Sequence, residues 1–238
     1  MPTLLSAISH DLRTPLASLV ALADSMSLTQ PPPSGAQVTI VEAMRDAAMR
    51  MNSLVNKLLD MARLQSGQVQ LNRQWQPLEE VVGSALKAMG GALAAHPLRV
   101  ALPPDLPLLH IDAVLIERVL CNLLENALKY TPPGSPIEIS ASSGSDVVQV
   151  SVEDHGPGLP KGREEAIFEK FERGKKESAT PGVGLGLAIC RAIVEAHGGT
   201  IRGETRAEGG ARFTFSLPRG VPPVLDDIDT AALAEEAQ

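Results

Sequence analysis

Residues 122–131 read Asn-Leu-Leu-Glu-Asn-Ala-Leu-Lys-Tyr-Thr, and the spacing of their polar side chains decides how this part of the chain folds. On a helix, Asn122, Glu125, Asn126 and Lys129 fall at i, i+3, i+4 and i+7, so they form one polar stripe on a helix rich in leucine. Such a stripe is usually a solvated face. Asparagine is a poor helix former, however, so two asparagines one turn apart above a lysine favour a binding role. Amide oxygens suit a hard cation such as Mg²⁺, and an ammonium group suits phosphate.

The helix that carries this stripe is predicted to begin at Asp112, a carboxylate at the helix start, and to end before Thr131-Pro-Pro-Gly. Around it, residues 69–218 alternate short strand patterns with helix patterns. Mixed strands with antiparallel hairpins beside helices indicate an α+β layer sandwich. The expected strands are Gln68–Leu71, Leu98–Leu102, Pro136–Ser142, Val147–Glu153, Gly199–Glu204 and Ala211–Leu217, and the expected helices are Leu78–Met89, Asp112–Tyr130 and Gly186–His197.

The N-terminal region, residues 1–66, has the apolar spacing of two helices joined by the breaker Gln30-Pro-Pro-Pro-Ser-Gly35. One hairpin has too little partner surface to bury both apolar seams, so we expect two copies to associate as a four-helix bundle. The first seam is Leu5, Ile8, Leu12, Pro15, Leu19 and Leu22, and the second is Val41, Met44, Ala48, Met51, Val55, Leu58 and Ala62.

The chain therefore divides into a helical hairpin at 1–66, an α+β domain at 67–218 and a tail at 219–238. The tail has little core material, so we expect it to be disordered. Its acidic residues are Asp226, Asp227, Asp229, Glu235 and Glu236.

The composition limits the classes of protein to which the chain can belong. The chain has 238 residues, 44% of them hydrophobic, a net charge of −7 and a pI of about 5.3. Without a basic surface we expect no direct binding of nucleic acid. Cys121 and Cys190 lie among apolar neighbours, which indicates buried, reduced thiols of a cytoplasmic protein. No apolar run approaches the roughly 18–20 residues that span a bilayer, so we expect the chain as given to be soluble.

A histidine motif lies in the first helix, at Ser9-His10-Asp11-Leu12-Arg13-Thr14-Pro15-Leu16. If Leu5 begins the heptad, His10 falls at position f, which a helix exposes. Asp11 can accept the N–H of one ring nitrogen and make the other more nucleophilic. Thr14, one turn on, can hold a water near a group attached to the ring. Alone the motif is weak, because a surface histidine beside an aspartate is usually only solvated.

Two glycine-containing stretches are candidates for a nucleotide site. Val152-Glu-Asp154-His-Gly156-Pro-Gly158 ends a predicted strand, where the aspartate could accept an exocyclic amine and the glycines could let backbone approach a flat ring. Gly182-Val-Gly184-Leu185-Gly186 opens a predicted helix, whose N–H groups could cradle phosphate. It is neither a Walker A loop nor a dinucleotide fingerprint. The alternatives without a binding role are an ordinary Asp-Gly turn and a flexible loop.

Between these stretches lies Phe168-Glu-Lys-Phe171-Glu-Arg173-Gly, followed by a polar segment. The two phenylalanines could anchor a mobile lid, and Arg173 could reach a terminal phosphate. The alternative is a surface loop with an apolar foot.

The order of these motifs along the chain resembles the core of sensor histidine kinases: a histidine helix, an asparagine helix, an Asp-Gly turn, a phenylalanine segment and a glycine loop. The resemblance extends from about Leu4 to Leu217. A closer resemblance, to the sensor kinases of high-affinity potassium-transport systems, is carried by Leu58-Leu-Asp-Met-Ala-Arg-Leu-Gln-Ser-Gly67, Glu79-Glu-Val-Val-Gly-Ser-Ala-Leu86, Glu117-Arg-Val-Leu and Arg173-Gly-Lys-Lys-Glu-Ser-Ala-Thr-Pro-Gly-Val-Gly-Leu-Gly186.

The resemblance implies a homodimeric phosphotransfer hairpin and a Bergerat-type ATP-binding domain that uses ATP and Mg²⁺. It implies that His10 accepts phosphate beside the acid Asp11, that the phosphate passes to a response regulator, and that Thr14 serves in dephosphorylating that partner. Asn126 is the implied Mg²⁺ ligand. The implied nucleotide-binding residues are Asn122, Asn126, Lys129, Tyr130, Asp154, Gly156, Gly158, Phe171, Arg173, Gly182, Gly184, Leu185 and Gly186.

The sequence departs from the family pattern in two ways. His155 stands where the family often has asparagine, and the sensory and membrane-anchoring parts of such kinases are expected upstream of the sequence given. Two other functions stay open. One is a conformational ATPase of the gyrase, chaperone or mismatch-repair type, although Asn122 stands where such enzymes resemble one another in using a glutamate base. The other is a kinase-inactive scaffold that binds a response regulator.

Overall fold

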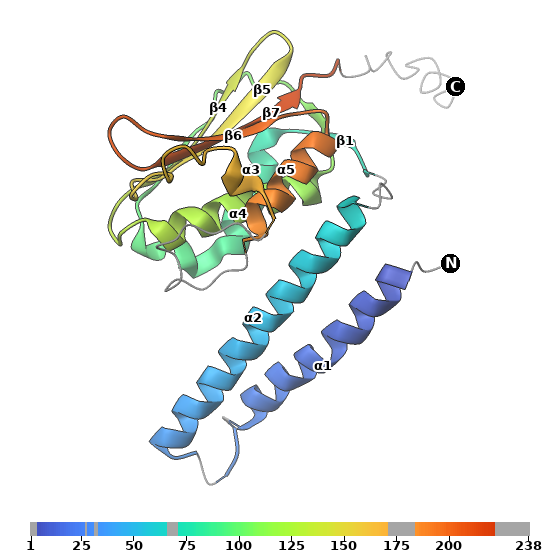
Figure 1. Cartoon of the computed structure of the whole chain (residues 1–238), viewed down its shortest axis with the longest axis vertical. Coiled ribbons are helices and arrows are strands. Elements are labelled where there is room, and N and C mark those ends of the chain that lie inside the picture. Colours follow the sequence, from blue (N-terminus) through green and yellow to red (C-terminus); the bar gives the residue numbers. More distant parts are fainter. Residues whose placement is uncertain (1–3, 27, 31–32, 66–70, 171–183, 222–238) are drawn as a thin grey trace, which may run out of the picture.

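In a computed structural model, the described residues are 4–26, 28–30, 33–65, 71–170 and 184–221, and residues 4–13, 50, 53 and 56–65 are described by their backbone alone. The described chain forms a long helical hairpin followed by a sandwich of helices and sheet (Figure 1). The predicted α+β class and this order of parts are therefore confirmed.

The hairpin consists of α1, Leu4–Met26, and α2, Gly35–Gln65. The two helices run side by side, and the C-terminal part of α2 leads to the sandwich, where α2 also contacts α5, Gly186–Ala196 (Figure 1). The buried side chains between the helices repeat every seven residues, as a heptad seam requires. They are Leu16 and Ala23 of α1 and Val41 and Ala48 of α2.

Only part of the predicted seams is buried within a single hairpin. Leu19 and Leu22 are 48% and 63% exposed, while Leu16 and Ala23 make the contact with α2. On α2, Val41 and Ala48 are buried but Met44 and Met51 are exposed. A hairpin gives each helix only one neighbour, so only one side of a broad apolar stripe can be covered within the chain. The rest of the stripe lies on the open side.

Within the described residues the sandwich has a five-stranded sheet in the order β2-β4-β5-β7-β6. β2 and β4 are parallel and the other neighbours are antiparallel. The strands are β2 Leu98–Ala101, β4 Ile137–Ser143, β5 Val147–Glu153, β6 Ile201–Thr205 and β7 Ala211–Pro218.

One face of this sheet is covered by α3, Leu78–Met89, α4, Ala113–Tyr130, and α5 (Figure 1). Alternate residues of the strands point at the helices and form the core, because successive side chains of a strand point to opposite faces. Buried members of that core include Ile139, Val150, Phe215, Ile116, Leu120, Leu123 and Ile189. The opposite face keeps its polar side chains, which leaves room there for a network of charges.

Five predicted strands and three predicted helices are confirmed, with ends that differ by two residues or fewer. A second sheet was not predicted: β1, Gln74–Gln76, pairs antiparallel with β3, Leu109–Ile111. Three residues give no alternation to recognise. The predicted strand Gln68–Leu71 falls outside the described residues except for Leu71, which is not in a strand. Two short 3₁₀ helices, Gly90–Ala95 and Ala166–Phe168, complete the described elements.

Asp112 caps α4 as predicted and joins three parts of the chain. Its carboxylate accepts hydrogen bonds from the backbone N–H of Leu115, at 3.2 Å, and of Asn72, at 3.0 Å. Its own N–H donates to Nε2 of the buried His197 at 3.0 Å, while Nδ1 of that ring lies 2.8 Å from the carbonyl of Ile193. The end of α5, the start of α4 and the chain that follows the hairpin are therefore bonded together.

Among the described residues, no helix has both the length and the apolar character needed to cross a bilayer. Cys190 is buried and Cys121 half-buried, and within the same residues neither is in a disulfide bond. The acidic tail predicted at 219–238 lies outside the described residues from position 222 on.

Candidate nucleotide-binding site

The polar stripe of α4 is not a uniformly solvated face. Asn122 is only 5% exposed, and its Nδ2 has no hydrogen-bond partner among the described residues. An unpaired buried amide costs about 1–3 kcal/mol, so its presence needs an explanation. Its Oδ1 would lie 3.4 Å from a β-carbon placed on Gly186. The asparagine helix and the start of α5 therefore meet at these two residues.

The rest of the stripe changes in exposure along the helix. Glu125 is exposed, while Asn126, Lys129 and Tyr130 are half-buried. The Lys129 ammonium lies 4.6 Å from the centre of the Tyr130 ring. Asn126 and Lys129 thus lie about one turn apart near the C-terminal end of α4, and both are partly accessible to solvent.

Asp154 follows the last residue of β5 and is buried, with 5% exposure. Its Oδ1 accepts the N–H of Gly156 at 2.8 Å and the N–H of Ala211 at 3.2 Å. Its backbone N–H donates to the carbonyl of Ala211 at 2.9 Å. A carboxylate has more acceptor positions than these two bonds occupy, so Asp154 can accept a further donor.

The glycines after Asp154 are required by the packing of the chain itself. A β-carbon on Gly156 would lie 2.7 Å from the carbonyl oxygen of Tyr130, at the end of α4. Gly158 has φ +77°, and a β-carbon there would lie 2.6 Å from Cγ2 of Thr205. The sequence interpretation gave these glycines the task of admitting a ring. Their contacts show that Gly156 lets the Asp154 turn lie against the end of α4, and that Gly158 lets it lie against Thr205 at the end of β6.

The second glycine stretch is described from Gly184 onward. Gly184 has φ +71°, Leu185 is buried at the N-terminal boundary of α5, and Gly186 is its first residue. Backbone N–H groups of this first turn have no partner within the helix, and they can bind an anion. The predicted residues Phe171, Arg173 and Gly182 lie outside the described residues.

Phe168 anchors the segment before residue 171, as the sequence indicated for an apolar residue at this position. It is buried, and its ring meets the Phe213 ring edge to face at 6.4 Å between centroids. The guanidinium of Arg191 lies 4.5 Å from its centroid, and the same guanidinium donates to Glu165 at 2.6 Å. The segment that leads toward residue 171 is therefore fixed to α5 and β7.

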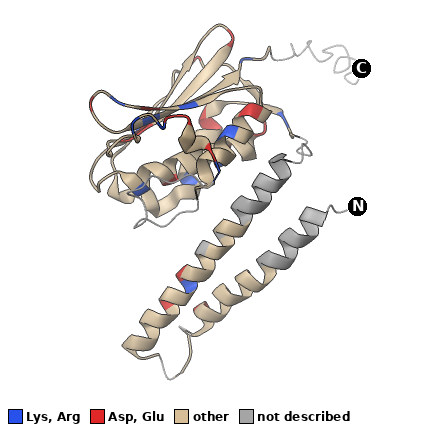
Figure 2. Ribbon diagram, in the orientation of Figure 1, with Lys and Arg blue, Asp and Glu red and all other residues tan. Residues whose placement is uncertain are grey.

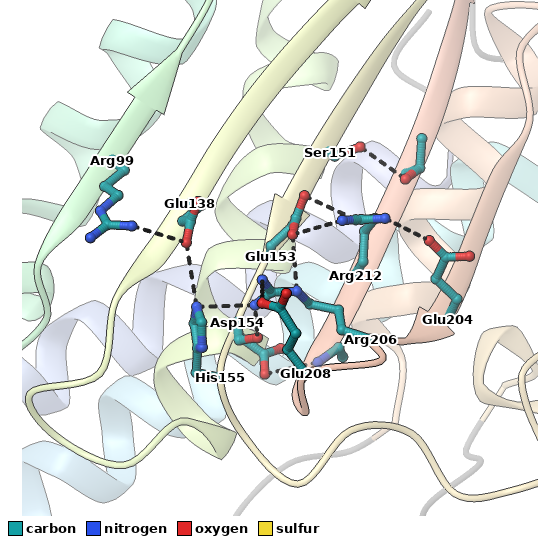
Figure 3. Close-up of polar contacts among 12 residues, drawn as sticks. Arg99, Glu138, Ser151, Glu153, Asp154, His155, Glu204, Arg206, Glu208 and Arg212 are labelled. Carbon is teal, nitrogen blue, oxygen red and sulfur yellow. Dashed lines mark hydrogen bonds and ion pairs between the residues drawn. The ribbon is translucent and has the colours of Figure 1, made fainter.

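A charged network on the open face of the sheet was not predicted (Figure 3). Glu153 pairs with Arg206, at 3.0 Å from Nε, and with Arg212, at 2.9 Å from Nε. The hydrogen bond that Arg212 donates to Glu153 raises the pKa of Arg212. His155 lies beside this network, with Nε2 3.0 Å from Nη1 of Arg206 and 3.3 Å from Glu138. His155 and Arg206 are 51 residues apart in sequence, and Glu153 and Arg212 are 59 residues apart. Only charges of opposite sign in different strand patterns pointed to these pairs.

The residues of the histidine motif lie in α1, in the helical hairpin. The backbone of His10 and Asp11 is helical, while their side chains are outside the description, so the expected f position stays a prediction. Thr14 is exposed, and its carbonyl accepts a hydrogen bond from the Ser18 hydroxyl at 3.0 Å. The site between α4, α5 and the Asp154 turn is thus formed without these residues.

Comparison with known families assigns the class. The His Kinase A (phospho-acceptor) domain matches residues 3–67, and the histidine kinase-, DNA gyrase B- and HSP90-like ATPase family matches residues 111–221. The catalytic domain of histidine kinase ThkA is 30% identical, with a TM-score of 0.54 over 62% of this chain and 96% of that one. The chain belongs to the histidine kinases.

Within that class the chain is 50% identical to Sensor protein KdpD of Escherichia coli (strain K12) over 224 residues, which are 94% of this chain and 25% of that protein. The full-length ShkA structure, a complex with AMPPNP, superposes with a TM-score of 0.77 at 28% identity, over 93% of this chain and 47% of ShkA. The chain spans about a quarter of the length of the KdpD proteins it matches.

Proposed function

We propose that this chain is the core of a two-component sensor kinase, which transfers the γ-phosphoryl group of ATP to His10 and then to an aspartate of a response regulator. In this proposal residues 1–66 form the dimerisation and phosphotransfer domain, residues 67–218 bind ATP, and residues 219–238 form a tail.

The observation that carries the proposal is the buried, unpaired amide of Asn122 against Gly186. A polar atom without a partner in a folded protein indicates that a ligand or water completes its hydrogen bonds. The amide lies between a helix N-terminus, which suits phosphate, and a stripe that ends in a lysine. A nucleotide with its phosphates at the start of α5 fits both features.

Each residue of the site then has a task. Asp154 accepts the exocyclic amine of adenine, which distinguishes it from guanine. Lys129 and the N–H groups at Gly184, Leu185 and Gly186 bind the phosphates.

Asn126 would hold Mg²⁺ through its amide oxygen, a ligand type that this cation accepts. Among the described residues no three His, Cys, Asp or Glu side chains gather into a metal site, so the remaining ligands would be phosphate oxygens and waters. Bound there, Mg²⁺ supplies neutralisation of charge on the phosphates.

At His10, one ring nitrogen forms a bond to the γ-phosphorus as the bond to the bridging oxygen breaks, and ADP leaves. Asp11 accepts the N–H of the other ring nitrogen and stabilises the charge that develops on the ring. On the same face Thr14 holds a water for the reverse task, hydrolysis of the phosphorylated regulator. Replacing Thr14 with alanine should slow loss of label from a purified phosphorylated regulator, and an equal rate would remove this role.

Dimerisation follows from the open side of the hairpin. Leu22 and Met51 are 63% and 58% exposed. The side chains of α1 are described for residues 14–26. Asp24 is the charged residue among them, and it pairs with Arg45 at 2.8 Å (Figure 2). A helix face with exposed apolar side chains, whose one charge is paired within the hairpin, favours burial against a second copy.

Potassium or osmotic-stress signalling is the finer part of the proposal, supported by the 50% identity to Sensor protein KdpD. The cytoplasmic side of an inner membrane, reached through a part of the protein upstream of this sequence, is the corresponding location. A strain that lacks its own kinase of this type, complemented with the full-length protein, should regain growth at low potassium if this part is right.

The kinase can be distinguished from the two other functions by the chemistry of its product. Incubation with γ-³²P-ATP should label the chain, and the label should be lost in acid but kept in base, as phosphohistidine is. A conformational ATPase would release phosphate without labelling, and a scaffold would do neither.

A further inference from the structure

We propose that Arg206 is a positioning residue of the nucleotide site, which holds Asp154 in the orientation that reads the base. The inference rests on the proposed role of Asp154. Arg206 lies in the turn between β6 and β7, outside every motif that the sequence offered. Its side chain is only 11% exposed although it carries a charge, so its surroundings hold it closely.

The guanidinium of Arg206 bonds to two consecutive residues at the end of β5. Nη1 donates to the backbone carbonyl of Asp154 at 3.0 Å, and Nε pairs with Oε2 of Glu153 at 3.0 Å (Figure 3). The guanidinium is planar and its donors have a fixed geometry, so two bonds from one group fix the direction of the chain at this point. The point is the residue whose carboxylate is to meet the base.

The turn that carries Arg206 also packs directly against Asp154. The N–H of Arg206 donates to the carbonyl of Gly210 at 2.9 Å, which closes the turn. A β-carbon on Gly210 would overlap the carbonyl oxygen of Asp154, and Ala211 binds both the backbone and the carboxylate of Asp154. Arg206 thus joins the carbonyl side of Asp154 to a turn that already fixes its carboxylate side.

His155 takes part in the same arrangement. Nη1 of Arg206 lies 3.0 Å from Nε2 of His155, and Oε1 of Glu138 lies 3.3 Å from the same ring nitrogen. His155 stands where the family often has asparagine. The shorter side chain of asparagine would make the contact with Arg206 differently. Arg206 connects both residues of the Asp154–His155 pair.

Arg212 offers a matched control. It pairs with the same Glu153, and with Glu204 at 3.2 Å. Among the described residues its guanidinium has no hydrogen bond with Asp154 or His155. Loss of Arg212 removes a charge from the network, whereas loss of Arg206 also releases the Asp154 carbonyl.

The experiment compares Arg206→Met, Arg206→Lys, Arg212→Met and Asp154→Asn with the unmutated chain. For each, thermal unfolding, the Kd for ATP and for GTP, and the autophosphorylation rate at saturating ATP are measured. We expect Arg206→Met to weaken ATP binding about tenfold, to reduce the preference for ATP over GTP, and to leave the saturated rate within about twofold. Arg212→Met should lower the unfolding temperature and leave the Kd for ATP within about twofold.

Arg206→Lys separates charge from geometry. A lysine can pair with Glu153, but its single ammonium cannot reproduce the two fixed bonds. It should therefore restore thermal stability more than it restores ATP affinity, and it remains informative if Arg206→Met does not fold.

The outcomes separate the inference from the proposal beneath it. If Asp154→Asn binds ATP as the unmutated chain does, Asp154 does not read the base, and both claims fall. If Asp154→Asn loses affinity while the Arg206 variants bind ATP no worse than Arg212→Met, the role of Asp154 stands and the role of Arg206 falls.

Discussion

Oδ1 of Asn122 lies 3.4 Å from the position that a β-carbon would occupy on Gly186. These residues are on two different helices, α4 and α5, and both belong to motifs recognised in the sequence. The space between a buried amide and the first turn of a helix is therefore kept free by the absence of a side chain at position 186.

Replacing Gly186 with alanine tests this space. Alanine is a better helix former than glycine, and the new methyl group would lie in ordinary contact with Asn122, at 3.4 Å from its Oδ1. We expect the unfolding temperature to stay level or rise while ATP binding weakens at least fivefold, as measured by thermal unfolding and nucleotide titration.

Gly83→Ala is the control, because Gly83 lies in α3 and a β-carbon there would meet no atom within 4 Å. It should stabilise the fold and leave ATP affinity unchanged. Equal ATP affinity in the Gly186 and Gly83 variants would show that phosphate does not bind at the start of α5.

Asn126→Ala should lose Mg²⁺-dependent nucleotide affinity and turnover, since the amide is the protein's proposed ligand for the metal. The measurement is a titration with ATP in Mg²⁺ and in EDTA, where we expect the difference between the two conditions to shrink at least tenfold. Glu125→Gln, at the exposed neighbouring position, is the matched control and should keep the full difference. A full Mg²⁺ effect in Asn126→Ala would show that other residues hold the metal.

Stability should fall in mild acid because of His197. Burial lowers the pKa of its imidazole below the ordinary value of 6.5, although the bond to Ile193 opposes the shift. A lowered pKa means that the folded chain binds the proton less readily than the unfolded chain. The contribution is therefore complete above pH 6.5 and is lost as the pH falls through and below that value.

Urea unfolding at pH 7.5 and pH 5.5 measures this loss. His197→Gln should be less stable than the unmutated chain at pH 7.5 and should lose less on acidification. If both chains lose the same free energy of unfolding between the two values, His197 does not carry the acid sensitivity.

Met51→Glu should convert the proposed dimer into monomers, because it places a charge on the open face of the hairpin. Light scattering coupled to size exclusion gives the mass of each. Val114→Glu is the control, since Val114 is 75% exposed but lies at the start of α4. A monomeric mass for the unmutated chain would contradict the four-helix bundle.

The elements predicted well are those whose own residues specify them. β5 and α3 match their predicted ends because alternating valines and a helical set of buried residues repeat over several turns or pairs. β1 and β3 were missed because each has three residues and depends on the other for its hydrogen bonds. Leu16 was not expected in the hairpin seam because the pattern fits either side of a broad apolar stripe.

Much of the site could be proposed from motifs, but its connections could not. Asn122 and Asp154 carry their own signal in the residues beside them. The pairing of Arg206 with Glu153 has none, since strand order alone brings residues 153 and 206 together. The role of the glycines at 156 and 158 likewise depends on Tyr130 and Thr205, which the sheet and α4 place against them.

The central claim is that His10 receives phosphate from ATP bound in the α4–α5 site. The most direct measurement compares labelling of the unmutated chain and His10→Gln by γ-³²P-ATP, with ATP affinity and unfolding temperature recorded for both. We predict that His10→Gln binds ATP and unfolds like the unmutated chain but takes up no acid-labile label. Normal labelling of His10→Gln would show that another residue accepts the phosphate and would contradict the account.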